Sequence, residues 1–198
     1  MKDRAKEAGM RLFVACELPP AVKEELAQLQ GELRAQGAGR LRWVRPEGIH
    51  LTLKFLGGVS PAMAERVRGA LAGAISEPFA LSLRLGRVGS FGGRLLRVVW
   101  VGLEGDTEQL ASLAARVEKA LAPLGFERER RPFAAHLTLA RVPDETGMEE
   151  RSRLAALLEG FQRLPLPSMT VSEVSLMQSF LSTTGARYER LAAFPPGA

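Results

Sequence analysis

The two histidines of the chain, His50 and His136, each begin the same tetrapeptide, His-Leu-Thr-Leu. Imidazole titrates near neutral pH, so one histidine can be neutral while another is protonated. Such a pair can act as general base and general acid in one reaction. The hydroxyls of Thr52 and Thr138 add two hydrogen-bond donors that could stabilise charge on an oxyanion. We therefore take these four residues as the candidate catalytic set.

The tetrapeptide has the composition of a β-strand, in which successive side chains point to opposite faces. His50 and Thr52 then share one face, and Leu51 and Leu53 can enter the core on the other. A phosphodiester suits such a pair, because one imidazole takes a proton from water while the other protonates the departing oxygen. The alternative is that each histidine is a half-buried strand residue in ordinary β sequence. Two identical copies that hold every histidine of the chain favour the catalytic interpretation.

A metal is not expected in this site. The chain has one cysteine, Cys16, and two histidines, too few for a Cys/His zinc cluster. We expect no cofactor either. Gly57-Gly58 and Gly92-Gly93 are interpreted as turns, because no Gly-Lys-Ser/Thr ending of a phosphate-binding loop follows them.

The tetrapeptides belong to a longer repeat with an offset of 86 (136 − 50). At this offset the apolar runs Arg11–Val14 and Arg97–Trp100, both predicted strands, come into register. Two pairs of helices and a further pair of strands also align. The predicted helices are 21–35 with 107–121 and 60–74 with 146–159, and the further strands are 79–85 with 168–174.

The repeated unit, strand, helix, His-Leu-Thr-Leu strand, helix and strand, predicts an α+β fold with pseudo-twofold symmetry. We expect two lobes whose antiparallel sheets line a central cleft, with the helices outside. The repeats span about 10–95 and 96–181, within one domain of residues 10–198. The sequence halves need not coincide with the lobes. Residues 1–9 lie outside the repeat and are predicted to form a charged flexible tail.

Other residues could contribute to the site. Arg141 could bind phosphate, but five residues after His136 a regular strand would place it on the leucine face, so it needs a strand end or a bulge. Lys54 has the parity of His50 and could face the same way, or it could face solvent at a strand edge. Aromatic rings could stack on a nucleobase or pack in the core, and the candidates are Phe13, Trp43 and Phe133.

Composition limits the class of protein. Of 198 residues, 46% are hydrophobic and 25% are charged, as in one ordinary globular domain. No apolar run approaches the ~20 residues of a membrane helix, and no secretory pattern is visible; we expect a cytoplasmic protein. The formal charge of +5 favours an anionic partner, although an arginine-rich chain without asparagine is also typical of GC-rich coding.

With these motifs the chain resembles the two-histidine phosphoesterases, and among them the RNA 2′,3′-cyclic phosphodiesterases, also called 2′-5′ RNA ligases. The resemblance covers nearly the whole chain from Met10. One departure is Ala135, where the family usually has proline before the second histidine. The similar segments are MRLFVACELPP (10–20), RWVRPEGIHLTLKFLG (42–57), RVVWVGL (97–103), PFAAHLTLAR (132–141) and SFLSTTGARYERL (179–191).

The resemblance implies a bilobal phosphodiesterase that opens RNA 2′,3′-cyclic phosphate ends, including those of tRNA fragments, to 2′-phosphates. It implies that His50 is the proton donor, His136 the acceptor and Arg141 the phosphate-binding arginine. It also implies a reverse reaction that makes 2′-5′ linkages without ATP. We expect a monomer. Two alternatives stay open: a phosphodiesterase of small cyclic nucleotides or ADP-ribose cyclic phosphate, and a noncatalytic basic RNA-binding module.

Overall fold

The structure is a computed structural model that describes residues 9–161, 168–182 and 185–195. The predicted flexible tail, apart from Gly9, lies outside these residues. Among the helices that are described, none has the length and apolar character needed to cross a membrane.

Nine strands and four helices are described. The strands are β1 (Met10–Cys16), β2 (Arg42–Trp43), β3 (Leu51–Val59), β4 (Leu81–Phe91), β5 (Val98–Gly105), β6 (His136–Arg141), β7 (Ser168–Val171), β8 (Val174–Ser182) and β9 (Gly185–Phe194). The helices are α1 (Pro20–Leu33), α2 (Pro61–Ala74), α3 (Thr107–Leu121) and α4 (Met148–Gly160). Short helical turns span Arg34–Ala38, Pro46–Gly48, Gly93–Leu95 and Ala122–Leu124.

Local sequence signals account for the helix boundaries. Ser60 caps α2, because its hydroxyl accepts a hydrogen bond from the backbone N–H of Met63 at 3.2 Å, and Pro61 follows in the first turn. Helix α3 buries one stripe of residues with helical spacing, which comprises Leu110, Leu113, Ala114, Val117 and Leu121. Asp106 precedes α3 as predicted, but its carboxylate accepts the backbone N–H of Ser82 at 2.8 Å instead of capping the helix.

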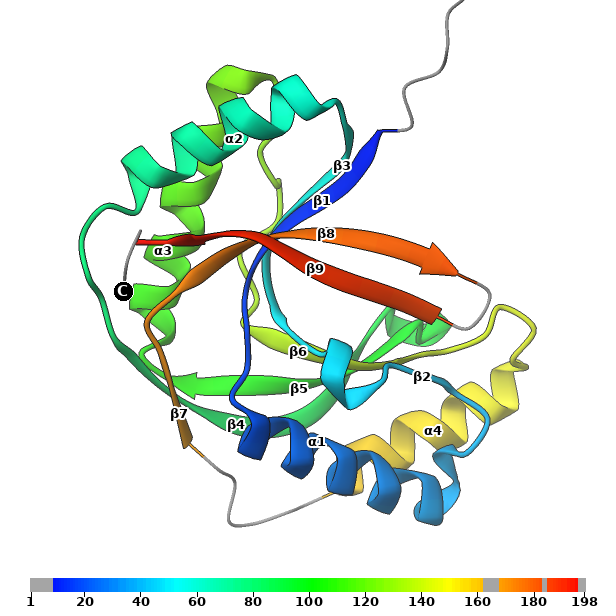
Figure 1. Cartoon of the computed structure of the whole chain (residues 1–198). Coiled ribbons are helices and arrows are strands. Elements are labelled where there is room, and N and C mark those ends of the chain that lie inside the picture. Colours follow the sequence, from blue (N-terminus) through cyan, green and yellow to red (C-terminus); the bar gives the residue numbers. More distant parts are fainter. Residues whose placement is uncertain (1–8, 162–167, 183–184, 196–198) are drawn as a thin grey trace, which may run out of the picture.

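The strands form two antiparallel sheets (Figure 1). One four-stranded sheet, here called sheet A, has the order β3-β1-β8-β9. The other, sheet B, has five strands in the order β2-β6-β5-β4-β7. The predicted α+β class with two antiparallel sheets is therefore confirmed. The prediction of one strand over 168–174 was wrong: this segment divides into β7, in sheet B, and β8, in sheet A.

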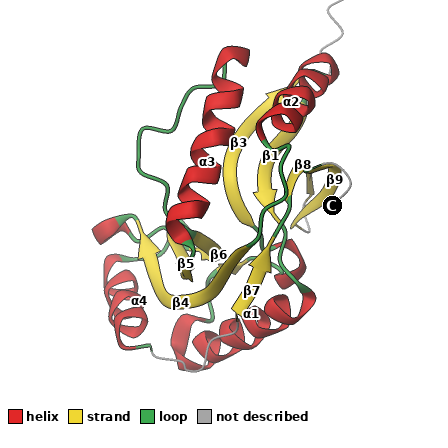
Figure 2. Cartoon of the chain, turned by 90° about the vertical axis from the view of Figure 1, so that its left-hand side faces the viewer, coloured by secondary structure: helices red, strands yellow, loops and turns green. Residues whose placement is uncertain are grey.

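The two halves of the sequence exchange elements. Strand β1 of the first half pairs with β3 on one side and with β8 of the second half on the other, while β4 of the first half pairs with β5 of the second. The helices are exchanged as well, since α3 packs beside α2 and contacts β3. Figure 2 shows α2 and α3 at one end of the molecule and α1 and α4 at the other. Each lobe thus contains two strands and a helix from the other half of the sequence: β8, β9 and α3 in one lobe, and β2, β4 and α1 in the other.

The core is formed by one large apolar cluster that joins both sheets and all four helices. The leucines of the two tetrapeptides lie within it: Leu51, Leu137 and Leu139 are completely buried and Leu53 nearly so. The predicted division of each tetrapeptide into a core face and an opposite face is thus observed, and the opposite face is left to the histidines and threonines.

Candidate active site

Both histidines are held by the same local hydrogen bond. The Nδ1 atom of His50 lies 2.9 Å from the carbonyl oxygen of Gly48, and Nδ1 of His136 lies 2.7 Å from that of Ala134. A carbonyl only accepts, so Nδ1 must carry the hydrogen in each ring. In a neutral imidazole Nε2 is then unprotonated. Each histidine therefore presents Nε2 for proton transfer.

A bulge follows the threonine in each of the two strands. In β3, Thr52 pairs with Ala15 and Lys54 with Val14, so Leu53 is the extra residue. In β6, Thr138 pairs with Trp100 and Ala140 with Val99, so Leu139 is extra. Each bulge reverses the alternation of side chains beyond it. Arg141 thereby reaches the face of His136 and Thr138.

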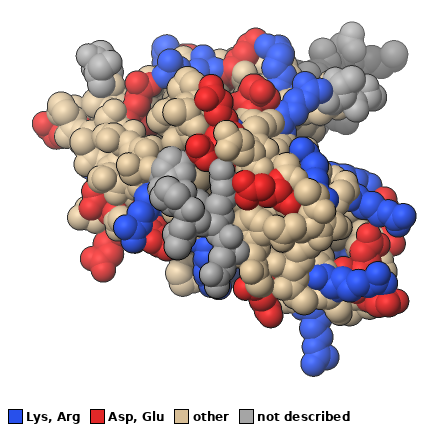
Figure 3. All heavy atoms as spheres, turned by 90° about the horizontal axis from the view of Figure 1, so that it is seen from below, with Lys and Arg blue, Asp and Glu red and all other residues tan. Residues whose placement is uncertain are grey.

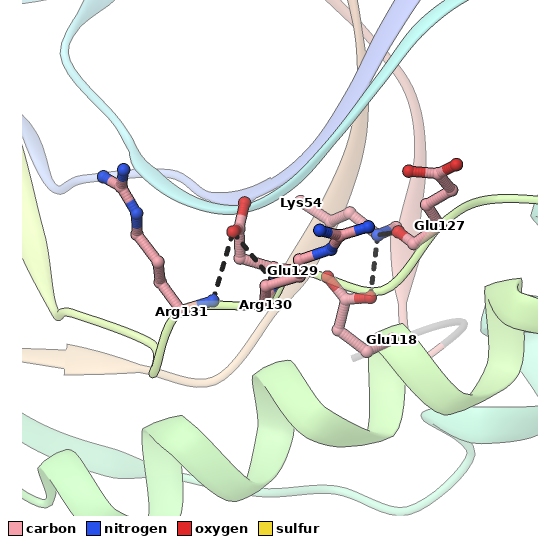
Figure 4. A network of polar contacts seen from close by, with 6 residues as sticks. All are labelled: Lys54, Glu118, Glu127, Glu129, Arg130 and Arg131. Carbon is pink, nitrogen blue, oxygen red and sulfur yellow. Dashed lines mark hydrogen bonds and ion pairs between the residues drawn. The ribbon is translucent and has the colours of Figure 1, made fainter.

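Lys54 shows the opposite effect of the bulge, because it turns away from the face of His50. Its Nζ lies 2.7 Å from a carboxylate oxygen of Glu118 in α3 and 2.7 Å from the carbonyl oxygen of Glu127 (Figure 4). The side chain of Lys54 is only 6% exposed. Lys54 therefore anchors β3 to α3, and neither of the two orientations expected from the sequence is the one observed.

One cleft joins the two sheets beside the tetrapeptides, with a volume of about 370 Å³. Its walls include His50, Thr52, Thr138 and Arg141, four of the five candidates. Arg11 lines it as well, and no aspartate or glutamate is among the described residues that do so. Arg11 and Arg141 form no ion pair within the described part of the chain. The cleft thus offers two arginines to an anion without a competing carboxylate.

His136 is the fifth candidate, and it is not among the residues that line this cleft. It is half-buried on the same strand face as Thr138, and its ring meets that of Phe91 edge to face at 4.8 Å between centroids. The second histidine thus lies next to the cleft wall formed by Thr138.

Burial distinguishes the two histidines electrostatically. His50 stacks on Phe13 at 4.6 Å between ring centroids and meets the edge of Tyr188 at 5.1 Å. Burial is the main reason that the pKa of His50 is lowered to about 4; the hydrogen bond to the Gly48 carbonyl opposes it, and the smaller effects of Lys23 and Glu17 lower and raise the pKa, respectively. Without a bound anion, His50 is therefore neutral at pH 7.

Of the three aromatic residues suggested by the sequence as base-stacking groups, Phe13 lines the cleft, and Trp43 and Phe133 do not. Phe13 is 3% exposed beneath His50, and Trp43 and Phe133 pack against the core. Sequence reasoning missed two aromatic residues that line the cleft together with Phe13, namely Phe55 and Tyr188. Phe55 could have been found as the counterpart of Arg141 at the offset of 86, whereas Tyr188 is the one tyrosine of the chain and has no such counterpart.

No group of three or more histidine, cysteine, aspartate or glutamate residues in the described segments is arranged to hold a metal ion. Cys16 is buried in β1, and burial raises the pKa of its thiol to about 12. The thiol is therefore protonated and unreactive at neutral pH.

Comparison with known proteins assigns the chain to a family of phosphoesterases. A model of the LigT-like phosphoesterase family matches residues 17–100 and, a second time, residues 101–188. The chain therefore belongs to the LigT-like phosphoesterases, which are two-histidine phosphoesterases. The two matches correspond to the two copies of the internal repeat seen in the sequence.

Similar proteins are matched over most of their length. The RNA 2′,3′-cyclic phosphodiesterase of Methanothermobacter thermautotrophicus is 33% identical over 93% of this chain and 98% of its own. That of Archaeoglobus fulgidus is also 33% identical, over 93% of this chain and 99% of its own. The crystal structure of Escherichia coli LigT with 3′-AMP superposes with a TM-score of 0.72, at 29% identity and over 94% of this chain and 97% of that one.

Proposed function

We propose that the protein hydrolyses the 2′,3′-cyclic phosphate at the end of an RNA to a 2′-phosphate, without a metal ion. The observation that carries the proposal is the pair of His-x-Thr-x strands from the two sheets, each presenting Nε2 of a histidine held by the same hydrogen bond. The names of the relatives in Methanothermobacter and Archaeoglobus support this substrate class.

In the proposed reaction a water molecule attacks phosphorus and the bond from phosphorus to O3′ breaks. Nε2 of His136 takes a proton from the water, and Nε2–H of His50 gives one to O3′. Thr52, Thr138 and Arg141 stabilise the negative charge on the nonbridging oxygens. The product carries a 2′-phosphate and a free 3′-hydroxyl. One water molecule is consumed, and the proton that His136 takes up balances the one that His50 gives up.

The donor role requires that His50 become protonated. Its pKa of about 4 in the unliganded protein opposes this. A phosphodiester anion bound next to Nε2 favours the charged imidazolium and raises that pKa. We therefore propose that substrate binding brings the proton to His50, while His136 acts as the base.

The same groups would support the joining reaction. The 5′-hydroxyl of a second RNA replaces water as the nucleophile, and the product is a 2′-5′ phosphodiester with a free 3′-hydroxyl. The substrates would include tRNA fragments with cyclic phosphate ends, and the protein would act as a monomer.

The test is incubation of purified protein with an RNA that ends in a 2′,3′-cyclic phosphate, in excess EDTA, with the product phosphate located by phosphorus NMR. We expect a 2′-phosphate. Activity that chelation abolishes and a divalent ion restores would overturn the metal-independent mechanism. Faster turnover of ADP-ribose cyclic phosphate or of mononucleoside cyclic phosphates would identify a small-molecule phosphodiesterase. RNA binding without turnover would identify a noncatalytic RNA-binding module.

Variants at the candidate residues separate binding from chemistry. His50→Ala and His136→Ala should each reduce kcat by ~10²–10⁴-fold, the usual effect of losing a positioned acid or base. RNA binding should be largely retained. Arg141→Ala should raise KM as well as lower kcat, because it removes a charge-assisted contact with phosphate.

A further inference from the structure

Arg151 is a buried cation in the first turn of α4. It is 6% exposed and shares the buried stripe of this helix with Leu154 and Leu158. Within the described segments its guanidinium forms hydrogen bonds to backbone carbonyls and no ion pair. Burying a charge is costly unless hydrogen bonds compensate for the lost water. The partners of Arg151 therefore indicate its role.

The carbonyls that Arg151 binds belong to two segments that flank the second catalytic strand pair. Nε donates to the carbonyl oxygen of Thr146 at 2.9 Å, and Nη2 donates to those of Pro143 at 2.9 Å and Asp144 at 3.3 Å, all in the segment after β6. Nη1 donates to the carbonyl oxygen of Leu96, two residues before β5. The planar guanidinium thus cross-links both segments, which a single ammonium nitrogen cannot span in the same way.

This cross-link begins directly beyond Arg141, the last residue of β6. The next residue, Val142, donates its backbone N–H to the carbonyl oxygen of Arg97 at 2.8 Å. Pro143 follows, and its carbonyl is bound by Arg151. Strand ends fray unless their backbone is held. Arg151 therefore fixes the point at which the side chain of Arg141 leaves the strand.

The first half of the sequence has an exposed acidic residue at the equivalent position. At the offset of 86, Arg151 corresponds to Glu65 of α2, whose side chain is 65% exposed and pairs with Arg68. Arg141 corresponds to Phe55. The repeated fold therefore does not itself require a buried arginine at this helix position, and this arginine occurs in the half that carries Arg141.

We propose that Arg151 is a positioning residue for Arg141, and this rests on the proposed function of the cleft. Arg151 is not among the described residues that line the cleft, so it acts through Arg141 and does not contact the substrate. It holds the end of β6 and so keeps the Arg141 guanidinium where the phosphate binds. With a loose strand end, phosphate binding would include the entropy cost of ordering Arg141.

A double-mutant cycle between Arg151 and Arg141 tests this role. Arg151→Lys keeps the positive charge and has one donor nitrogen in place of three. We expect it to lower kcat/KM for cyclic-phosphate RNA on the order of 10-fold in the wild-type background, and by less than about twofold in the Arg141→Ala background. Equal reductions in both backgrounds, or none in either, would overturn the proposal, because a general structural defect acts independently of Arg141.

Arg153→Lys is the matched control. Arg153 lies on the same helix, its side chain is 74% exposed, and it pairs with Glu149 at 2.8 Å. The control should leave kcat/KM unchanged. Arg151→Gln is a second test variant, because it leaves no unpaired charge in the interior, and thermal melting verifies that each variant is folded. If neither Arg151 variant folds, Arg151 is a structural residue and the proposal is overturned.

Calorimetry with adenosine 2′-phosphate separates this inference from the proposed function. The dissociation constant should rise in Arg151→Lys, whereas the double variant should bind no more weakly than Arg141→Ala alone. If no cyclic phosphate is opened but this coupling is present, the proposed function fails and the positioning role stands. If turnover is normal and the coupling is absent, the positioning role fails alone.

Discussion

Identical tetrapeptides place His50 and His136 in different surroundings. His50 lies between the rings of Phe13 and Tyr188, and burial lowers its pKa to about 4. His136 touches the edge of Phe91 and is further from the cleft. Because the repeated residues are the same, any difference between acid and base must come from these neighbours.

The identity of the leaving group distinguishes the proton donor from the acceptor. A ribose oxygen needs protonation as it departs, whereas nitrophenolate leaves as a stable anion. If His50 is the donor, His50→Ala should be severely impaired on cyclic-phosphate RNA and much less impaired on a nitrophenyl phosphodiester. His136→Ala should be impaired on both, because water still needs a base. Steady-state rates of both variants on both substrates give the result, and the reverse pattern would exchange the two roles.

The lowered pKa of His50 also couples stability to pH. The unfolded chain binds a proton at His50 near pH 6.5, whereas the folded protein binds it only near pH 4. The unfolded state therefore holds more protons between these values, and the free energy of unfolding should fall as the pH drops through this window. The fall attributable to His50 is on the order of 2–3 kcal/mol.

Urea unfolding between pH 7 and pH 4 measures this coupling. His50→Gln has no titrating ring at this position and should lose a large part of the pH dependence. Equal slopes for wild type and His50→Gln would show that His50 is not the group that titrates.

At the scale of elements, the bulge in β6 is held by a helix from the other half of the sequence. Gln30 of α1 is 1% exposed, and its Nε2 donates to the carbonyl oxygens of Val44 at 2.8 Å and Leu139 at 3.1 Å. Leu139 is the extra residue of the bulge, and its carbonyl also accepts the N–H of Val44 at 2.9 Å. Gln30 thus holds the backbone turn that brings Arg141 into the cleft.

Replacing Gln30 with leucine should loosen this bulge. The change leaves buried carbonyls with fewer partners and should cost ~1–3 kcal/mol of stability. It should also raise KM, as we expect for Arg141→Ala, because Arg141 is no longer held in place. Gln36→Leu, at an exposed position just beyond α1, is the control for the substitution itself. A destabilised Gln30→Leu variant with unchanged KM would restrict Gln30 to a structural role.

The repeat and the alternation of tetrapeptide side chains could be predicted from sequence because both follow from spacing alone. The start of α2 was predicted from Ser60-Pro61 and that of α3 from Gly105-Asp106, although the Asp106 side chain does not cap the helix. The bulges could not be predicted, because they depend on the register between strands. For this reason the direction of Lys54 was missed. Tyr188 was missed because β9 reaches His50 only through the pairing of distant strands.

At the scale of the whole molecule, basic side chains are balanced by acidic ones to a different degree on different parts of the surface. On the face covered by α1 and α4, basic and acidic side chains lie interspersed (Figure 3). Ion pairs there, such as Arg153 with Glu149 at 2.8 Å, neutralise part of the charge. In the cleft, Arg11 and Arg141 are accompanied by no lining carboxylate from the described part of the chain. Phosphates should therefore be bound mainly in the cleft.

The salt dependence of RNA binding tests this distribution. Two phosphate contacts on a single strand predict a slope of about −1.4 for log affinity against log salt concentration, since each contact contributes about −0.7. Arg11→Ala should reduce the magnitude of the slope by about half. Binding titrations at several salt concentrations measure it. An affinity that does not change with salt concentration would show that the net charge of +5 reflects amino-acid composition and does not contribute to RNA binding.

The exchange of β4, β8, α1 and α3 between the two lobes has a consequence for the origin of the fold. A chain of half this length would lack two strands and one covering helix of its own lobe, and it would hold one histidine. Two such chains could complete each other only by trading these elements, as in a domain-swapped homodimer. An ancestor before the duplication would then have been an intertwined dimer with one shared active site, and joining the two copies would have made that site independent of protein concentration.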